Sequence, residues 1–209
     1  MNIADIPQPQ GVLKDLNDAF PLIFRAMEGG TQKAREYFDR EQCPVEPFLF
    51  THVTRFKAKQ FLDGLGFHTD ELPNNGLSLT SGIYTLRILK SDYGNTPAPG
   101  YSFARQHFWC QGVLPAPPKI VQLYGPTWRK VNLLLLWDVD RRHNLTDMTL
   151  ELPRNGGIAR ASAEVYWSVP VPHPALAQQV PSLPQTTDDE EDLPMGLLNE
   201  RRAVSGREE

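Results

Sequence analysis

The chain has 209 residues, of which 40% are hydrophobic, and its formal net charge is −4. That length fits one domain with appendages, and four Trp and ten Phe supply enough apolar surface for a packed core. No apolar run approaches the roughly 18 residues that a membrane span needs. Cys43 and Cys110 match no metal or disulfide framework. We therefore expect a soluble, cytoplasmic protein with free thiols.

The negative charge is concentrated at the C-terminal end. Residues 186–209 contain eight acidic residues and three arginines, a net charge of −5, so the rest of the chain is near +1. A body with so little excess positive charge does not indicate a large surface for nucleic acid.

Helical spacing of apolar residues dominates the first third of the chain. Apolar residues recur at helical intervals over 12–27, with an interruption at Pro21. Gly29-Gly30 is expected to end that segment, and a further helix is expected over 31–40. Pro after Glu46 predicts the start of a helix that runs over 47–65.

From Leu77 the pattern changes to the alternation that is typical of strands. We expect a tight hairpin at Ser81-Gly82, a strand over 119–124, a central hairpin within 130–152 and a last strand over 160–169. Within the long connection at 91–118 we expect one short helix at 102–111.

Helices followed by strands indicate an α+β fold. We expect about three N-terminal helices followed by a mostly antiparallel, strongly bent sheet or half-barrel of about six strands. The expected order is a flexible arm at 1–10, one α+β domain at 11–178 and a disordered acidic tail at 179–209. Within that domain the helices occupy 11–66 and the strands 77–169.

The end of the central hairpin is one candidate site. A four-residue loop at 141–144 places Asp138 opposite Asp147 and brings Asp140 to the same face, with His143 on the loop. Opposed like charges are destabilising, so this cluster predicts Mg²⁺ or Mn²⁺ held by Asp138, Asp140 and Asp147. A metal-activated water could then hydrolyse a phosphoester, with Asp138, Asp140 and His143 as the catalytic candidates. The alternatives are neutralisation by nearby arginines, or a one-residue register shift that disperses the cluster.

A second candidate is basic. His52, Arg55 and Lys59 share one stripe of the helix expected over 47–65. Such a stripe could bind phosphates or an acidic partner, and an Arg–His pair could serve a metal-independent ribonuclease. The alternative is the hydrated face of an amphipathic helix.

Two further segments have the composition of interfaces. The connection at 91–118 is rich in aromatic residues and proline, and its candidate binding residues are Tyr101, Phe103, Arg105, Phe108 and Trp109. The alternative is that these rings cover the sheet core. The acidic tail leads into an apolar cluster of a kind that orders on binding a partner, formed by Leu193, Met195, Leu197 and Leu198.

The chain lacks the common phosphate-loop, dinucleotide, zinc-protease and nucleophile-elbow motifs. We therefore expect a non-enzymatic accessory or regulatory protein of a bacterial or phage system that binds a protein partner without a cofactor. The alternatives are a Mg²⁺- or Mn²⁺-dependent nuclease or phosphoesterase, and a toxin-like ribonuclease or RNA-binding protein.

Overall fold

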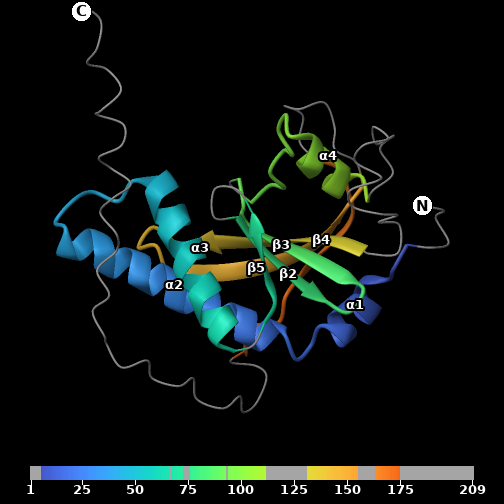
Figure 1. The fold of residues 1–209 in the computed structure, drawn as a ribbon, viewed down its shortest axis with the longest axis horizontal. Coiled ribbons are helices and arrows are strands. Elements are labelled where there is room, and N and C mark those ends of the chain that lie inside the picture. The colour runs from blue at the N-terminus through green and yellow to red at the C-terminus, as the bar shows by residue number, and fades with distance from the viewer. Residues whose placement is uncertain are drawn as a thin grey trace, which may run out of the picture. The chain divides into compact units, whose positions relative to one another are not determined.

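The computed structural model describes residues 6–65, 67–72, 76–92, 94–111, 131–154 and 163–174. Over these residues the chain forms four helices and one open sheet of six strands (Figure 1). The elements in chain order are α1 (Pro9–Asp15), α2 (Phe20–Arg40), α3 (Pro47–Gly64), β1 (Thr69–Leu72), β2 (Gly76–Ser81), β3 (Tyr84–Lys90), α4 (Phe103–Trp109), β4 (Val131–Val139), β5 (Leu145–Pro153) and β6 (Val165–Pro170). The expected α+β class is confirmed.

The strands follow one another across the sheet in chain order, β1 to β6. Neighbouring strands pair antiparallel except β3 and β4, which are parallel and are joined by the long connection that contains α4. The sequence did not predict β1, because Thr69–Leu72 has only one apolar residue. The strand expected over 119–124 lies outside the described residues.

The expected helix end at Gly29-Gly30 is wrong, because α2 continues through both glycines to Arg40. A Cβ added at Gly30 would lie 2.5 Å from the carbonyl oxygen of Thr54 on α3. The glycine therefore allows the two helix backbones to approach closely, and it has no role in ending α2.

The start of α3 agrees with the sequence prediction. Pro47 is the first helical residue, and the Glu46 side chain accepts hydrogen bonds from the backbone N–H groups of Phe48 and Leu49. These contacts satisfy two of the donors that a helix N-terminus leaves unpaired.

The sheet has a core on each face. On one face α1, α2 and α3 pack their buried side chains against Leu86, Ile88 and Leu135 of the central strands. On the other face the Phe108 and Trp109 rings of α4 cover Leu134 and Leu136 of β4. In Figure 1 α2 runs below the strands and α4 lies above them.

One transverse row of side chains crosses this second face. Residues that are paired across neighbouring strands point to the same side of a sheet. The registers join Asp70, Ser78, Arg87, Leu134, Glu151 and Ser168, one from each strand in order. The row therefore places a basic and an acidic side chain on either side of the buried Leu134.

Candidate anion-binding site

Arg87 lies in the middle of β3 and on the face that α4 covers. Its neighbours Leu86 and Ile88 are buried in the core that α1, α2 and α3 form with the sheet. Side chains alternate between the two faces along a strand, so Arg87 points to the opposite face. There its guanidinium carbon lies 4.4 Å from the centroid of the Phe108 ring. The negative face of an aromatic ring attracts a cation, so Phe108 helps to fix the position of this charge.

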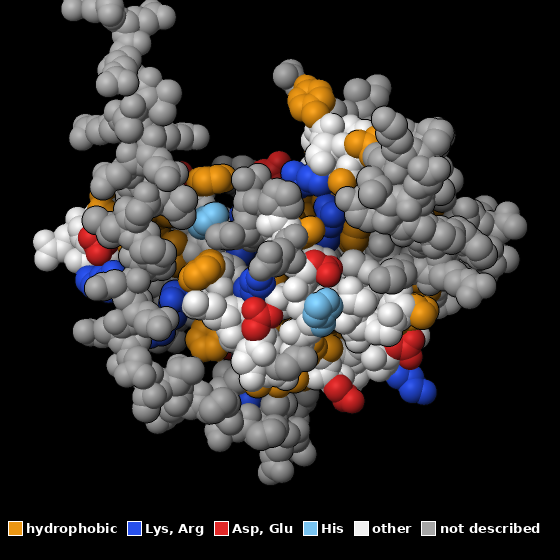
Figure 2. Space-filling view, in the orientation of Figure 1, with side chains coloured by type: hydrophobic (Ala, Val, Ile, Leu, Met, Phe, Trp, Pro, Cys, Tyr) orange, Lys and Arg blue, Asp and Glu red, His pale blue; other side chains and the backbone are white. Residues whose placement is uncertain are grey.

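A second arginine comes from α4 itself. The guanidinium carbon of Arg105 lies 5.5 Å from the centroid of the Trp109 ring, and the Trp109 and Phe108 centroids are 5.8 Å apart. Arg87 and Arg105 therefore lie over two adjacent rings of one short helix. Figure 2 shows Lys and Arg side chains gathered beside α4 on the face toward the viewer.

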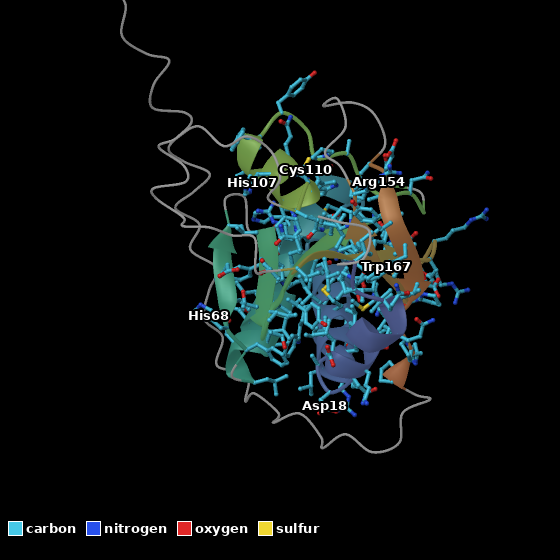
Figure 3. All side chains as sticks on the ribbon, turned by 90° about the vertical axis from the view of Figure 1, so that its right-hand side faces the viewer. Asp18, His68, His107, Cys110, Arg154 and Trp167 are labelled. Atoms are coloured by element: carbon cyan, nitrogen blue, oxygen red, sulfur yellow. The ribbon has the colours of Figure 1, made fainter. Side chains whose placement is uncertain are left out.

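Gln111, just after α4, attaches that helix to the sheet. Its Nε2 donates to the carbonyl oxygens of Asn132 at 2.7 Å and Pro153 at 3.1 Å, and its Oε1 accepts from the Asn132 N–H at 2.9 Å. In Figure 3 the labelled His107 and Cys110 mark α4 above the sheet. This buried amide holds the helix, and with it Arg105, in one place over β4 and β5.

A third arginine, Arg55, comes from α3. It follows His52 by three residues and His52 follows Phe48 by four, so the three side chains share one stripe of the helix. Phe48 is 70% exposed, and its ring stacks on the His52 ring with the centroids 6.4 Å apart. The stripe thus leads from an exposed aromatic ring to a half-buried guanidinium group.

Burial and the charge of Arg105 set the pKa values of this group of arginines. Burial is the main reason that their pKa values are lowered, and the pKa of Arg87 falls to about 10. The positive charge of Arg105 lowers the pKa values of both Arg55 and Arg87 further. Asp70 acts on Arg87 in the opposite direction, but less strongly. Burial and the charge of Arg55 also lower the pKa of His52.

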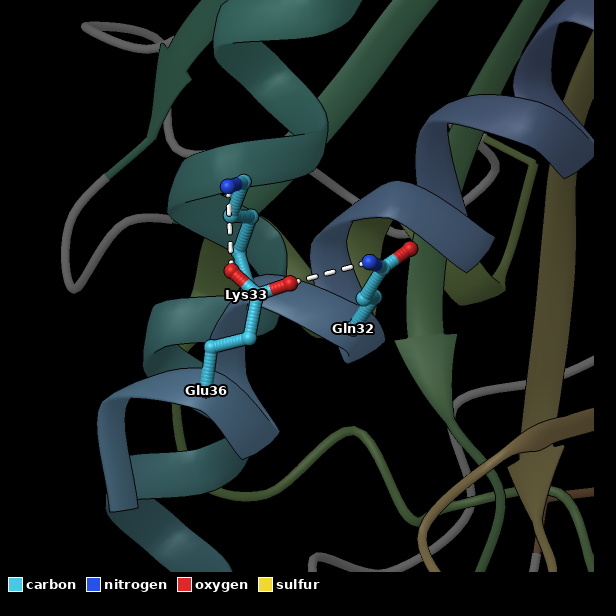
Figure 4. A network of polar contacts seen from close by, with 3 residues as sticks. All are labelled: Gln32, Lys33 and Glu36. Atoms are coloured by element: carbon cyan, nitrogen blue, oxygen red, sulfur yellow. Dashed lines mark hydrogen bonds and ion pairs between the residues drawn. The ribbon is translucent and has the colours of Figure 1, made fainter. Parts of the chain in front are cut away.

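Within the described residues, no carboxylate forms an ion pair with Arg55, Arg87 or Arg105. The Nε atom of Arg55 is buried and has no hydrogen-bond partner among these residues. Ion pairs on the exposed surface join Lys33 to Glu36 (Figure 4), Arg40 to Glu41 and Arg154 to Glu164.

These observations define the arginine cluster, which consists of Arg55, Arg87 and Arg105. A half-buried cation is costly when it lacks a partner, and like charges raise that cost. An oxyanion placed among the three groups would accept hydrogen bonds from them and offset their repulsion. The cluster is therefore chemically suited to bind an anion.

The sequence located part of this site. It marked His52 and Arg55 as anion-binding candidates, together with Lys59, which lies one turn beyond Arg55 on α3. It marked Arg105 only as an interface residue and missed Arg87. A basic residue in the middle of a strand, between the apolar Leu86 and Ile88, was the signal that could have revealed it.

The aromatic residues of the 91–118 connection divide into two groups. Phe108 and Trp109 are buried and form the second core with Leu134 and Leu136. Tyr101 is 73% exposed, and Phe103 is half-buried. The candidate docking residues of the tail, Leu193, Met195, Leu197 and Leu198, lie outside the described residues.

The acidic end of the central hairpin differs from its expected geometry. The predicted register holds as far as the pair of Trp137 and Met148, and then it shifts by one residue. Asp138 consequently faces both Thr146 and Asp147 in a β-bulge. Its carboxylate accepts a hydrogen bond from the Ser91 hydroxyl at 2.7 Å.

Asp140 closes the hairpin loop. Its carboxylate accepts hydrogen bonds from the N–H of Arg142 and from both the N–H and the side-chain amide of Asn144, each at 2.8 Å. These bonds lower the pKa of Asp140. His143 has a positive φ of 61°, and its ring packs against Phe50 with the centroids 4.9 Å apart. Asp140 and His143 therefore serve the turn.

A cavity of about 420 Å³ lies beside the bulge, and Asp138, Asp147 and Glu151 are among its lining residues. Glu151 is 6% exposed, and its two oxygens accept hydrogen bonds from the Thr96 and Ser168 hydroxyls. In the described part of the chain, no group of three or more His, Cys, Asp or Glu residues is arranged to hold a metal ion.

None of the described helices is both long enough and apolar enough to cross a membrane. Comparison of the chain with protein-family models, with curated proteins and with solved structures finds no match.

Proposed function

We propose that this chain is a non-enzymatic accessory or regulatory protein that binds a protein partner by holding an anionic side chain of that partner in the arginine cluster. The observation that carries the proposal is the set of three half-buried guanidinium groups with no carboxylate paired to them among the described residues. The free protein already bears the desolvation and repulsion cost of these charges, and it gains a counter-charge only when an anionic partner binds.

A protein partner fits the surroundings of the cluster better than a nucleic acid does. Phe48 is 70% exposed on the stripe that contains Arg55, and Tyr101 is 73% exposed. Tyr101 directly follows Gly100, whose added Cβ would lie 3.9 Å from the Arg105 guanidinium. Exposed aromatic rings beside arginine are typical of protein interfaces, whereas nucleic-acid surfaces need a broad excess of positive charge.

The proposal can be tested with synthetic peptide mixtures whose central residue is defined and whose flanking residues are randomised. One set has an anionic centre, which is Asp, Glu or a phosphorylated residue, and the other has Ser or Ala. We expect the anionic set to bind at least ten times more tightly by fluorescence anisotropy. Replacing Arg105 and Arg55 by Gln should abolish that preference, while Arg40→Gln, an exposed arginine of α2, should keep it.

The proposal fails if neutral and anionic sets bind equally, or if the control arginine matters as much as the cluster. It also fails if single-stranded RNA binds more tightly than every peptide set at the same salt concentration.

A further inference from the structure

The anion-binding role proposed above leaves open which oxyanion the cluster accepts. We infer that it is the phosphate monoester of a phosphorylated side chain on the partner protein, so that the chain recognises a phosphorylated state. This inference rests on the proposed function and narrows it.

Charge is the first argument. The three guanidinium groups carry three positive charges, and burial keeps them from being fully hydrated. A carboxylate brings one negative charge, whereas a phosphate monoester brings about −1.5 to −2 near neutral pH. The monoester therefore relieves more of the repulsion that Arg105 exerts on Arg55 and Arg87.

Geometry is the second argument. The three arginines come from different elements, namely α3, β3 and α4, and two of them, Arg87 and Arg105, rest over adjacent rings of α4. A planar carboxylate offers two acceptor oxygens in one plane, which suits a single arginine fork. A tetrahedral phosphate group offers three acceptor oxygens that point in different directions. Guanidinium groups supplied by three different elements therefore suit the monoester better than they suit a carboxylate.

The rigidity of the site is the third argument. Arg87 rests over Phe108, Arg105 rests over Trp109, and Gln111 fixes the helix that carries both rings. A fixed array of donors discriminates between ligands of different shape, whereas long flexible side chains do not. A group of three cations on a body with little excess positive charge also suits one dianionic group better than the succession of singly charged phosphodiesters in a nucleic acid.

The test uses the full chain and three peptides that are identical except for phosphoserine, glutamate or serine at the centre, each flanked by aromatic residues. We expect the phosphoserine peptide to bind at least tenfold more tightly than the glutamate peptide in a titration at constant ionic strength. Free phosphoserine should compete with the peptide, and free glutamate at the same concentration should not. A single-stranded oligonucleotide of equal total charge should bind more weakly than the phosphopeptide.

Two variants separate recognition of shape from simple attraction of charge. Arg105→Lys keeps the charge and removes the planar fork, so it should weaken binding of the phosphopeptide at least tenfold. Arg105→Gln should also lose binding, yet the free protein should melt at the same or a higher temperature, because a repulsive charge has been removed. Arg40→Gln is the matched surface control.

The outcomes are distinct. If glutamate and phosphoserine peptides bind equally and both require the cluster, the inference is overturned and the proposed function stands. If no anionic peptide binds, both are overturned. If Arg105→Lys binds the phosphopeptide as the wild type does, charge alone explains binding and the inference is overturned. Where Arg105→Gln does not fold, as judged by circular dichroism, Arg55→Gln replaces it in the same comparison.

Discussion

The guanidinium carbon of Arg87 on β3 lies 4.4 Å from the centroid of the Phe108 ring on α4, although the two residues are 21 positions apart in sequence. The ring excludes water from one side of the guanidinium group, and its negative face attracts the positive charge. Burial at this position and the nearby charge of Arg105 lower the pKa of Arg87 to about 10. The contact therefore links the second core of the sheet directly to the arginine cluster.

The close packing of α2 on α3 predicts a large penalty for a side chain at position 30. Gly30→Ala places a Cβ 2.5 Å from the Thr54 carbonyl oxygen, and backbone cannot move aside as a side chain can. We expect a loss of about 1–3 kcal/mol in the free energy of unfolding, measured by urea denaturation. Gly11→Ala is the control, because its Cβ would meet nothing within 4 Å and should stabilise α1 by about 0.5–1 kcal/mol.

Gln111 should contribute much more to stability than an exposed glutamine does. Gln111→Ala leaves the N–H and carbonyl groups of Asn132 without their buried partner, which should cost about 1–3 kcal/mol. Gln32→Ala removes only an exposed contact to Glu36 and should change the unfolding free energy by less than about 0.5 kcal/mol. Equal effects in chemical denaturation would contradict the assigned role of Gln111.

The pKa of His52 should depend on the positive charge of Arg55. Burial is the main cause of the lowered pKa of His52, and the charge of Arg55 adds to it. Arg55→Gln should therefore move the pKa of His52 upward, while burial keeps it below the ordinary value. Histidine ring signals followed by NMR against pH would measure the shift. Lys59→Gln, on the same helix, should leave it nearly unchanged.

Tyr84 should make stability fall at alkaline pH. Burial, followed by the hydrogen bond to Asp15 at 2.7 Å, raises the pKa of its phenol to about 12. A raised pKa means that the folded state favours the neutral phenol. The resulting stability is complete below the ordinary pKa near 10 and is lost as the pH rises toward 12. Tyr84→Phe should remove one late-titrating phenol from the absorbance at 295 nm and flatten this part of the stability curve.

Asp140 should have the opposite pH dependence. Hydrogen bonds from the side chain and the backbone of Asn144 lower its pKa, so the folded state favours the carboxylate. Its contribution is present above the ordinary pKa of an aspartate and is lost as the pH falls below that value. Asp140→Ala should lower the melting temperature at pH 7 but have less effect near pH 2. Asp18→Ala, at an exposed position labelled in Figure 3, should change neither.

Local features of the sequence determined much of the fold. The Glu46-Pro47 pair predicted where α3 begins, because capping and the fixed φ of proline act within one helical turn. The change from helical spacing to alternation at Leu77 predicted the order of helices and strands. Each of these signals involves residues that are close in sequence, and therefore it could be interpreted without knowing what packs against them.

Only the tertiary structure decided the remaining features. Gly30 is needed inside α2 because the backbone of α3 packs closely against that position. No local sequence pattern shows this contact. One bulge at Asp138 shifts the register of the central hairpin, although the loop length predicted that Asp138 would stand opposite Asp147 in a regular ladder. The charge of Arg105 reaches both Arg55 and Arg87 because the fold brings α3, β3 and α4 near one another. Contacts between distant segments depend on the whole packing arrangement, and a sequence pattern carries only the local part of that information.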